Sequence, residues 1–213
     1  MKLILPLTSS NFDNTNTPTR HIAALRQQLV LYSEALNSIN FNAEVIVLQD
    51  VRTRVPRPLV KRYFSNKGVF PTVIKVGPFT KGSIMPLSEI RPRLVDSEIL
   101  IVEDLLEAVS KNVDFNAAVA ALRNYDSGVV TSSTPNASHA YARFDTNGTL
   151  AEITNTVIEN SAVTGIHYWK TSLDLIASLD SVLQNTFINA PMTINAAQNS
   201  MVNRNKSVGR FTV

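Results

Sequence analysis

Apolar runs alternate with polar segments along the first half of the chain, and each run predicts a buried strand. These runs lie at 3–7, 43–51, 72–76 and 99–102. After the first run, a polar loop at 8–19 precedes apolar positions that recur every 3.6 residues from Ile22 to Ile39, a period typical of an amphipathic helix. The segment 52–71 contains three prolines, so we expect a loop with at most a short helix at 59–64.

Hairpin signals characterise the second half of the chain. The pair Asn147-Gly148 is typical of a tight turn, and 150–153 is expected to pair back across it. Helices are expected at 115–124, which is rich in alanine, and at 172–185, with Ser172 as the N-cap. Further strands are expected at 128–134, 141–145, 165–169 and 207–213. Alternating strands and helices followed by hairpins predict an α/β fold with a mixed sheet.

Length and composition limit the classes of protein. The 213 residues fit a single domain, 1–213, and 44% hydrophobic with 17% charged residues is a globular composition. With 20 Lys and Arg against 17 Asp and Glu, the chain lacks the strong positive field of a duplex-DNA binder, so no nucleic-acid partner is expected. The absence of cysteine excludes disulfides and thiolate chemistry. The apolar run at 3–7 is too short for a signal peptide or a membrane span, so we expect a cytoplasmic protein without a membrane partner.

Charged residues nevertheless cluster in two adjacent regions. Such a cluster is either a solvated face or, for the basic region, an anion or polyphosphate site. The basic members are Arg52, Arg54, Arg57, Lys61, Arg62 and Lys67, and the acidic members are Glu89, Asp96, Glu98, Glu103, Asp104 and Glu107.

Several other chemistries have no support in the sequence. The histidines His21, His139 and His167 share no metal-ligand spacing, which favours satisfied or exposed imidazoles. The chain has no Gly-x-Ser-x-Gly elbow and no Walker phosphate loop. The adjacent rings of Tyr168 and Trp169 could stack on a sugar or a base, or could lie one in the core and one outside.

The order of the short motifs resembles that of the sugar-phosphate nucleotidyltransferases. The segment "YARFDTNGTLAEI" at 141–153 is similar to the family's YARxDxxGxVxEIxEK hairpin, and "GIHYW" at 165–169 is similar to its GIYYF strand. The segment 80–83 matches a Thr-x-Gly motif, and 188–201 resembles a late Asn-rich motif. The resemblance implies a single-domain, Rossmann-like three-layer sandwich with a mixed, mostly parallel central sheet and a β-hairpin in the second half.

The resemblance also implies an activity. A family member binds a nucleoside triphosphate and a sugar 1-phosphate with Mg²⁺, and the sugar phosphate attacks the α-phosphorus to make a nucleotide sugar. Asp104, at the end of the run 99–102, takes the position of the metal-binding Asp, and Glu103 could serve if the register is off by one. The resemblance therefore assigns catalysis to Arg20 and Asp104, the phosphate loop to Thr8, Ser9, Ser10 and Asn11, and the base and sugar contacts to Thr80, Lys81, Gly82, Ser83 and Gly165.

Several family positions are altered in this chain. The opening loop has no glycine, the family's Glu-Lys pair aligns with Asn155-Thr156, and the family's lysine aligns with an arginine, either Arg20 or Arg57. These changes fall at chemical positions while the core runs persist. Two alternatives therefore stay open: an inactive nucleotidyltransferase-fold module that binds a protein partner or forms a homo-oligomer, and a metal-dependent glycosyltransferase of similar topology.

Overall fold

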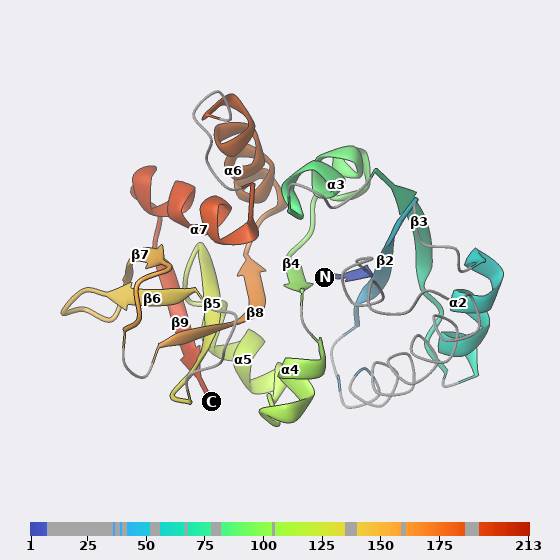
Figure 1. Cartoon of the computed structure of the whole chain (residues 1–213), viewed down its shortest axis with the longest axis horizontal. Helices are drawn as coiled ribbons and strands as arrows, with labels where there is room; N and C mark the ends of the chain where they lie inside the picture. Colours follow the sequence, from blue (N-terminus) through green and yellow to red (C-terminus); the bar gives the residue numbers. More distant parts are fainter. Residues whose placement is uncertain are drawn as a thin grey trace.

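The computed structural model shows a mixed sheet with helices on both faces (Figure 1). It describes residues 1–7, 36, 39, 42–51, 56–66, 68–77, 82–103, 105–134, 140–158, 161–185 and 192–213. Within these residues the sheet has nine strands: β1 Lys2–Leu7, β2 Glu44–Asp50, β3 Thr72–Val76, β4 Ile99–Val102, β5 Ser127–Ser132, β6 Tyr141–Phe144, β7 Leu150–Thr154, β8 Ala162–Trp169 and β9 Val208–Thr212. The expected α/β class with a mixed sheet is confirmed.

The strand order combines a parallel half and an antiparallel junction. The order is β3-β2-β1-β4-β8-β5-β9, with the β6–β7 hairpin attached to β8. Strands β1 to β4 are parallel to one another, and Ile4 lies between Ile46 of β2 and Ile101 of β4. Strand β8 is antiparallel to both β4 and β5, and β9 is parallel to β5. The long strand β8 therefore joins the two halves of the sheet.

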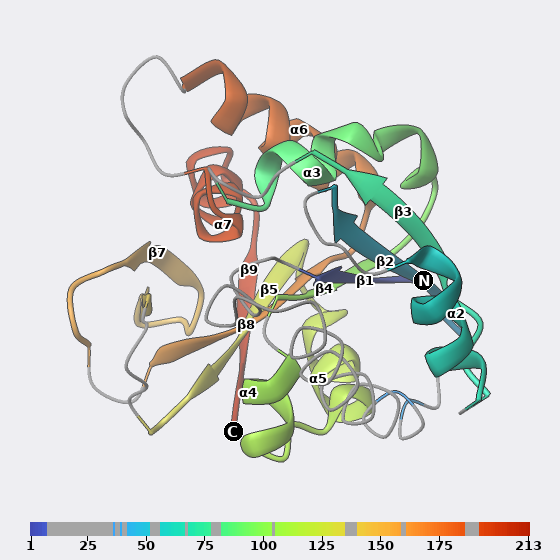
Figure 2. The ribbon, with the colours of Figure 1, turned by 45° about the vertical axis from the view of Figure 1, so that its right-hand side comes forward.

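Alternate residues of the strands build two apolar cores, one on each face of the sheet. Leu3, Leu5 and Leu7 of β1 pack on one face, and Ile4 packs on the other. The first core is covered by α2 (Arg57–Ser65), α4 (Leu105–Ser110) and α5 (Phe115–Leu122). The second is covered by α3 (Ile84–Glu89), α6 (Ser172–Gln184) and α7 (Ile194–Asn203). Figures 1 and 2 show the resulting three layers.

Helix boundaries differ from the expectations in two places. Helix α2 covers 57–65, more than the short helix expected at 59–64, because Pro58 falls in the first turn, where the missing N–H costs nothing. The N-cap of α6 is Thr171, whose side chain accepts a hydrogen bond from the Asp174 N–H, and Ser172 is the first helical residue.

Three helices were not expected from the sequence, and one expected helix cannot be compared. Helices α3 and α7 lie in segments without a clear helical period, at 84–89 and 194–203, and the third is the short helix α4 at 105–110. The loop expected at 8–19 and the helix expected at 22–39 lie outside the described residues, apart from Leu36 and Ile39. Of the helices that the structure describes, none combines the length and the apolar character that a membrane span requires.

Candidate functional site

The sheet has a topological switch point at the carboxyl ends of β1 and β4. The chain leaves β1 to form β2 and β3 on one side, and then crosses to form β4 on the other side of β1. In open α/β sheets such a switch point opens a crevice beyond the strand ends, where loops supply ligand contacts. Leu7 ends β1 and Glu103 follows β4 at this edge.

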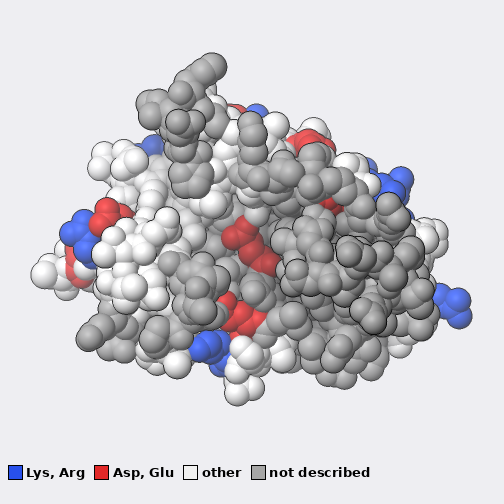
Figure 3. Space-filling model, in the orientation of Figure 1, with Lys and Arg blue, Asp and Glu red and all other residues white. Residues whose placement is uncertain are grey.

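Glu103 is the central described residue of this crevice. Its backbone N–H donates to the Gly165 carbonyl at 2.8 Å, and the Ser83 hydroxyl donates to its Oε1. Its side chain is 27% exposed, so the carboxylate can contact a ligand from solvent. Asp50, the other described carboxylate that ends a parallel strand, is wholly buried. Figure 3 shows acidic side chains gathered in a hollow near the centre of the face, where β4 and β8 lie in Figure 1.

Gly82 and Ser83 enter this site from the segment that precedes α3. The φ of Gly82 is +95°, a left-handed conformation, and a Cβ there would collide with the backbone carbonyl of Met192. The same carbonyl accepts the Ile84 N–H at 3.3 Å. A glycine is therefore required for the close approach that fixes Ser83 beside Glu103.

Gly165 reaches Glu103 because β8 is irregular at this point. The pairing of β8 with β5 shifts register between Val129 and Thr131, and Gly165 has a φ of +74°. A bulge re-aims backbone groups and favours glycine at positive φ. The predicted site residues Gly82, Ser83 and Gly165 thus meet, and Glu103 is the residue at which they meet.

His167 adds a buried imidazole to the site that sequence reasoning did not identify. Its Nε2 lies 3.8 Å from Glu103 Oε2, and its side chain is 1% exposed. Burial lowers the pKa of His167 to about 3, so the ring is neutral and the approach to Glu103 is not an ion pair. Neither ring nitrogen has a hydrogen-bond partner within the described part of the chain. The expectation of a satisfied or exposed imidazole is wrong for this residue.

A second hollow lies between the end of β7 and the start of α7. This cavity of about 240 Å³ is lined by amide, hydroxyl and apolar side chains, and none of the described residues that line it is charged. Asn155, aligned with the Glu of the family's Glu-Lys pair, is part of the lining, as are Thr193 and Asn195. The Asn195 Oδ1 is buried without a hydrogen-bond partner among the described atoms. Gly82, which precedes Ser83, packs against the backbone of Met192, the residue before Thr193 of the lining.

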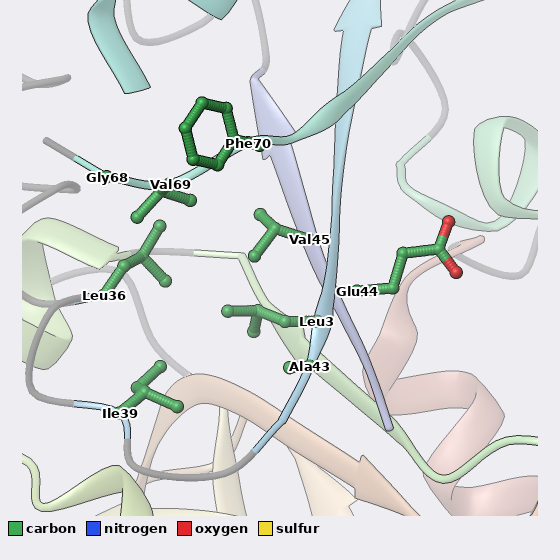
Figure 4. A pocket seen from close by; sticks show the side chains of 9 residues that line it. All are labelled: Leu3, Leu36, Ile39, Ala43, Glu44, Val45, Gly68, Val69 and Phe70. Carbon is green, nitrogen blue, oxygen red and sulfur yellow. The ribbon is translucent and has the colours of Figure 1, made fainter. Parts of the chain in front are cut away.

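A third hollow occupies the opposite edge of the sheet and carries no such chemistry. It has a volume of about 310 Å³ and lies at the amino ends of β1 and β2, between Leu3, Val45 and Val69 (Figure 4). Aliphatic side chains dominate its lining, and the Glu44 carboxylate points away from it and pairs with Lys2 at 3.3 Å. The lining residues that the structure describes do not provide the convergent polar groups that orient a substrate.

The remaining sequence-based site predictions have mixed outcomes. Both rings of Tyr168 and Trp169 are wholly buried, so neither stacking on a ligand nor an outward-facing ring is correct. Tyr168 packs in the apolar core on one face of the sheet, and Trp169 packs in the core on the other face. In the basic cluster, α2 exposes its described basic residues, as a solvated face does; these are Arg57, Lys61 and Arg62. The residues Thr8, Ser9, Ser10, Asn11, Arg20, Thr80, Lys81 and Asp104 lie outside the described residues, so their roles stay predictions.

Comparisons with solved structures identify the fold. A nucleoside-diphosphate-sugar pyrophosphorylase from Vibrio cholerae matches with a TM-score of 0.69 at 13% identity, over 100% of this chain and 92% of its own. The inositol-1-phosphate CTP transferase from T. maritima matches with a TM-score of 0.64 at 10% identity, over 99% and 84% of the two chains. The chain has the nucleotidyltransferase fold.

The fold extends to relatives of different specificity. The CTP:phosphocholine cytidylyltransferase from Streptococcus pneumoniae has a TM-score of 0.55 at 11% identity, over 100% of this chain and 89% of its own. No family model matches the sequence. No curated protein matches it either. The expected three-layer, nucleotidyltransferase-like architecture is therefore confirmed at the level of structure, with a sequence that has diverged widely.

Proposed function

We propose that the protein binds a nucleoside triphosphate and a sugar phosphate at the carboxyl edge of β1 and β4, and that it transfers the nucleotidyl group to the sugar phosphate. The observation that carries the proposal is the placement of Glu103, a partly exposed carboxylate at the switch point of the sheet, held by Ser83 and next to Gly165. This is where a sheet of this topology binds nucleotides. The solved structures with this fold include pyrophosphorylases and cytidylyltransferases.

The described residues would bind Mg²⁺ only together with a nucleotide that supplies further ligands to the metal. No group of three or more His, Cys, Asp or Glu side chains that could hold a metal ion exists among them. Magnesium in nucleotide sites uses one or two carboxylates and takes phosphate oxygens and water as its other ligands. Glu103 would meet that need as the alternative to Asp104, the next residue, to which the resemblance assigns the metal. When bound, Mg²⁺ would neutralise charge on the reacting phosphates.

Residues of the protein would position the reacting groups. The Ser83 hydroxyl orients the Glu103 carboxylate, and Gly82 keeps the neighbouring backbone close to the segment before α7. The cavity next to Asn155 would receive the sugar ring, because its amides and hydroxyls match neutral hydroxyl groups. Since no protein nucleophile is needed, rate enhancement would come from positioning and charge neutralisation.

Pyrophosphate release tests this proposal. The protein is incubated with each common nucleoside triphosphate, Mg²⁺ and a panel of sugar 1-phosphates, and we expect pyrophosphate from at least one combination. Glu103→Gln should lower that rate by about 100-fold or more, because several kcal/mol of charge stabilisation are lost. Glu152→Gln is the matched control, since Glu152 pairs with Arg143 on an exposed hairpin. The proposal would be contradicted if no combination released pyrophosphate and no nucleotide shifted the melting temperature of the protein.

A nucleotide-binding module without catalysis is the second candidate. It is favoured by the cavity between β7 and α7, which has Asn155 in place of a charged residue and no charge among its described lining side chains. Charged groups there would be needed to hold a sugar phosphate strongly. A thermal shift with nucleotides, but no pyrophosphate with any sugar phosphate, would select this candidate.

A further inference from the structure

Two uncharged side chains approach the two oxygens of the Glu103 carboxylate. The Ser83 hydroxyl donates to Oε1 from the start of α3. His167 Nε2 approaches Oε2 from β8, at 3.8 Å. The two contacts come from separate elements, so together they can define the plane of the carboxylate.

The position of His167 in the sheet fixes its ring. In the register of β8, His167 lies between Ile101 of β4 and Val129 of β5. Its ring centroid is 6.2 Å from that of Trp169, two residues further along the same face. The side chain is only 1% exposed, so the ring is enclosed on this face of the sheet.

The hydrogen-bonding capacity of His167 is unused in the described structure. A neutral imidazole has one N–H donor and one acceptor, and both nitrogens of His167 are buried without a partner among the described atoms. Burying an unpaired donor is unfavourable, which favours any small movement that gives the N–H a partner. Among the described contacts, the Glu103 carboxylate is the charged group next to Nε2.

We propose that His167 is a positioning residue, whose Nε2–H donates to Glu103 Oε2 when the candidate site is occupied and holds the carboxylate toward the crevice. This inference rests on the proposed function, because it takes Glu103 as a ligand of the metal–nucleotide complex. Carboxylates that bind metals are commonly held by such outer hydrogen bonds, and their removal lowers metal affinity by about 10- to 100-fold.

Equilibrium dialysis with Mn²⁺ measures this role directly. The probe is Mn²⁺ with an excess of an equimolar mixture of the common nucleoside triphosphates, and the readout is the Mn²⁺ retained on the protein side. We expect His167→Phe, which keeps a ring but loses the donor, to weaken retention by about 10- to 100-fold. His167→Gln, which places an N–H near the position of Nε2, should restore most of it. Glu103→Gln should abolish it.

The outcomes separate this inference from the proposed function. Wild-type retention in His167→Phe with loss in Glu103→Gln would overturn the role of His167 and leave the site intact. Wild-type retention in both variants would overturn the proposed site, and the inference with it. A purely structural role of His167 predicts lower stability in both His167 variants without rescue of Mn²⁺ retention by glutamine.

A measurement on the wild-type protein covers the case in which His167→Phe does not fold. The chain has 3 histidines, so their ring ¹⁵N signals can be assigned. With Mg²⁺ and the nucleotide mixture present, we expect His167 as the Nε2–H tautomer with slowed exchange of that proton. A bare Nε2 under these conditions would overturn the inference.

Discussion

Arg123 binds both carboxylate oxygens of Glu98, with Nε 2.9 Å from Oε1 and Nη2 2.8 Å from Oε2. The buried Tyr168 hydroxyl also donates to Oε1, at 2.9 Å. Glu98 immediately precedes β4, Arg123 follows α5 and Tyr168 lies in β8. This network therefore connects the strand that leads to Glu103 with the strand that carries Gly165 and His167.

Removing the Tyr168 hydroxyl should destabilise the fold. Tyr168→Phe keeps the buried ring but removes a hydrogen bond to a charged group, so we expect the free energy of unfolding to fall by about 1–2 kcal/mol. Urea unfolding measures the change. Arg143→Ala is the control: Arg143 and Glu152 form a pair whose side chains are 60% and 47% exposed, and its loss should cost less than about 0.5 kcal/mol. Equal losses in the two variants would contradict the role of the network.

Acid should weaken the fold through two carboxyl groups. Burial raises the pKa of Glu98, but the hydrogen bonds from Arg123 and Tyr168 outweigh it, and the pKa is lowered from 4.5. The Ser207 backbone N–H lowers the pKa of Asp126 from 3.8, and the Ser207 hydroxyl adds to this effect. Both carboxyl groups therefore bind protons less readily in the folded protein than in the unfolded chain. Their stabilisation is fully present at pH values above the unfolded pKa values of 4.5 and 3.8, and it is lost as the pH falls through the folded pKa values.

Urea unfolding at a series of pH values measures this loss. Asp126→Asn removes one of the two contributions, so the stability of this variant should depend less steeply on pH in the acid range than that of the wild type. At neutral pH the variant should be less stable, because Asp126 Oδ2 accepts from both the backbone N–H and the hydroxyl of Ser207, each at 2.9 Å. Parallel pH profiles for the two proteins would contradict the assignment.

Gly82→Ala should disturb the candidate site more than Gly68→Ala. Both glycines have positive φ, +95° and +79°, so both substitutions cost about 1 kcal/mol in backbone strain. Only at Gly82 does the new Cβ meet another segment, the Met192 backbone, while Gly68 has nothing within 4 Å. We expect Gly82→Ala to displace Ser83 and to weaken nucleotide binding, measured by thermal shift. Equal binding by the two variants would show that the Gly82 contact does not support the site.

The sequence was sufficient to predict most of the sheet and only part of the site. Continuous apolar runs located β1 and β4, because a strand that is buried on both faces is apolar at successive positions and not only at alternate ones. Helix α7 was missed because its Asn and Ser residues have modest helix propensity. Contacts distant in sequence stabilise it: the buried Gln198 accepts from the Ser127 hydroxyl at 2.9 Å and donates to the Gly128 carbonyl at 3.1 Å.

The site, too, was predictable where it depends on local motifs and not where it depends on contacts distant in sequence. Gly82, Ser83 and Gly165 were predicted from motif resemblance, and the structure brings them together at Glu103, which the sequence offered only as an alternative to Asp104. Strand periodicity places His167 on an inward face but does not say which carboxylate lies beside it. That neighbour depends on the antiparallel register of β4 and β8, which only the folded chain defines.

Asn199 should control the docking of the β6–β7 hairpin beside the neutral cavity. Its Oδ1 accepts the Ile153 N–H at 2.6 Å and its Nδ2 donates to the Ile153 carbonyl at 2.9 Å. The side-chain amide thus takes the place of a neighbouring strand on the edge of β7 that faces away from β6. Asn199→Ala removes both bonds, so we expect a loss of about 1–3 kcal/mol in unfolding free energy and faster hydrogen exchange at Ile153.

The exchange measurement includes its own reference within the same hairpin. The Thr149 N–H donates to Asp145 Oδ1 at 2.9 Å, inside the turn, so this hydrogen bond does not involve α7. Its exchange should therefore stay as slow in Asn199→Ala as in the wild type, while that of Ile153 accelerates. Asn199→Asp keeps an acceptor for the Ile153 N–H but loses the donor to its carbonyl, so its effect on stability should be intermediate. Unchanged exchange at Ile153 in Asn199→Ala would mean that the hairpin is held in place without α7.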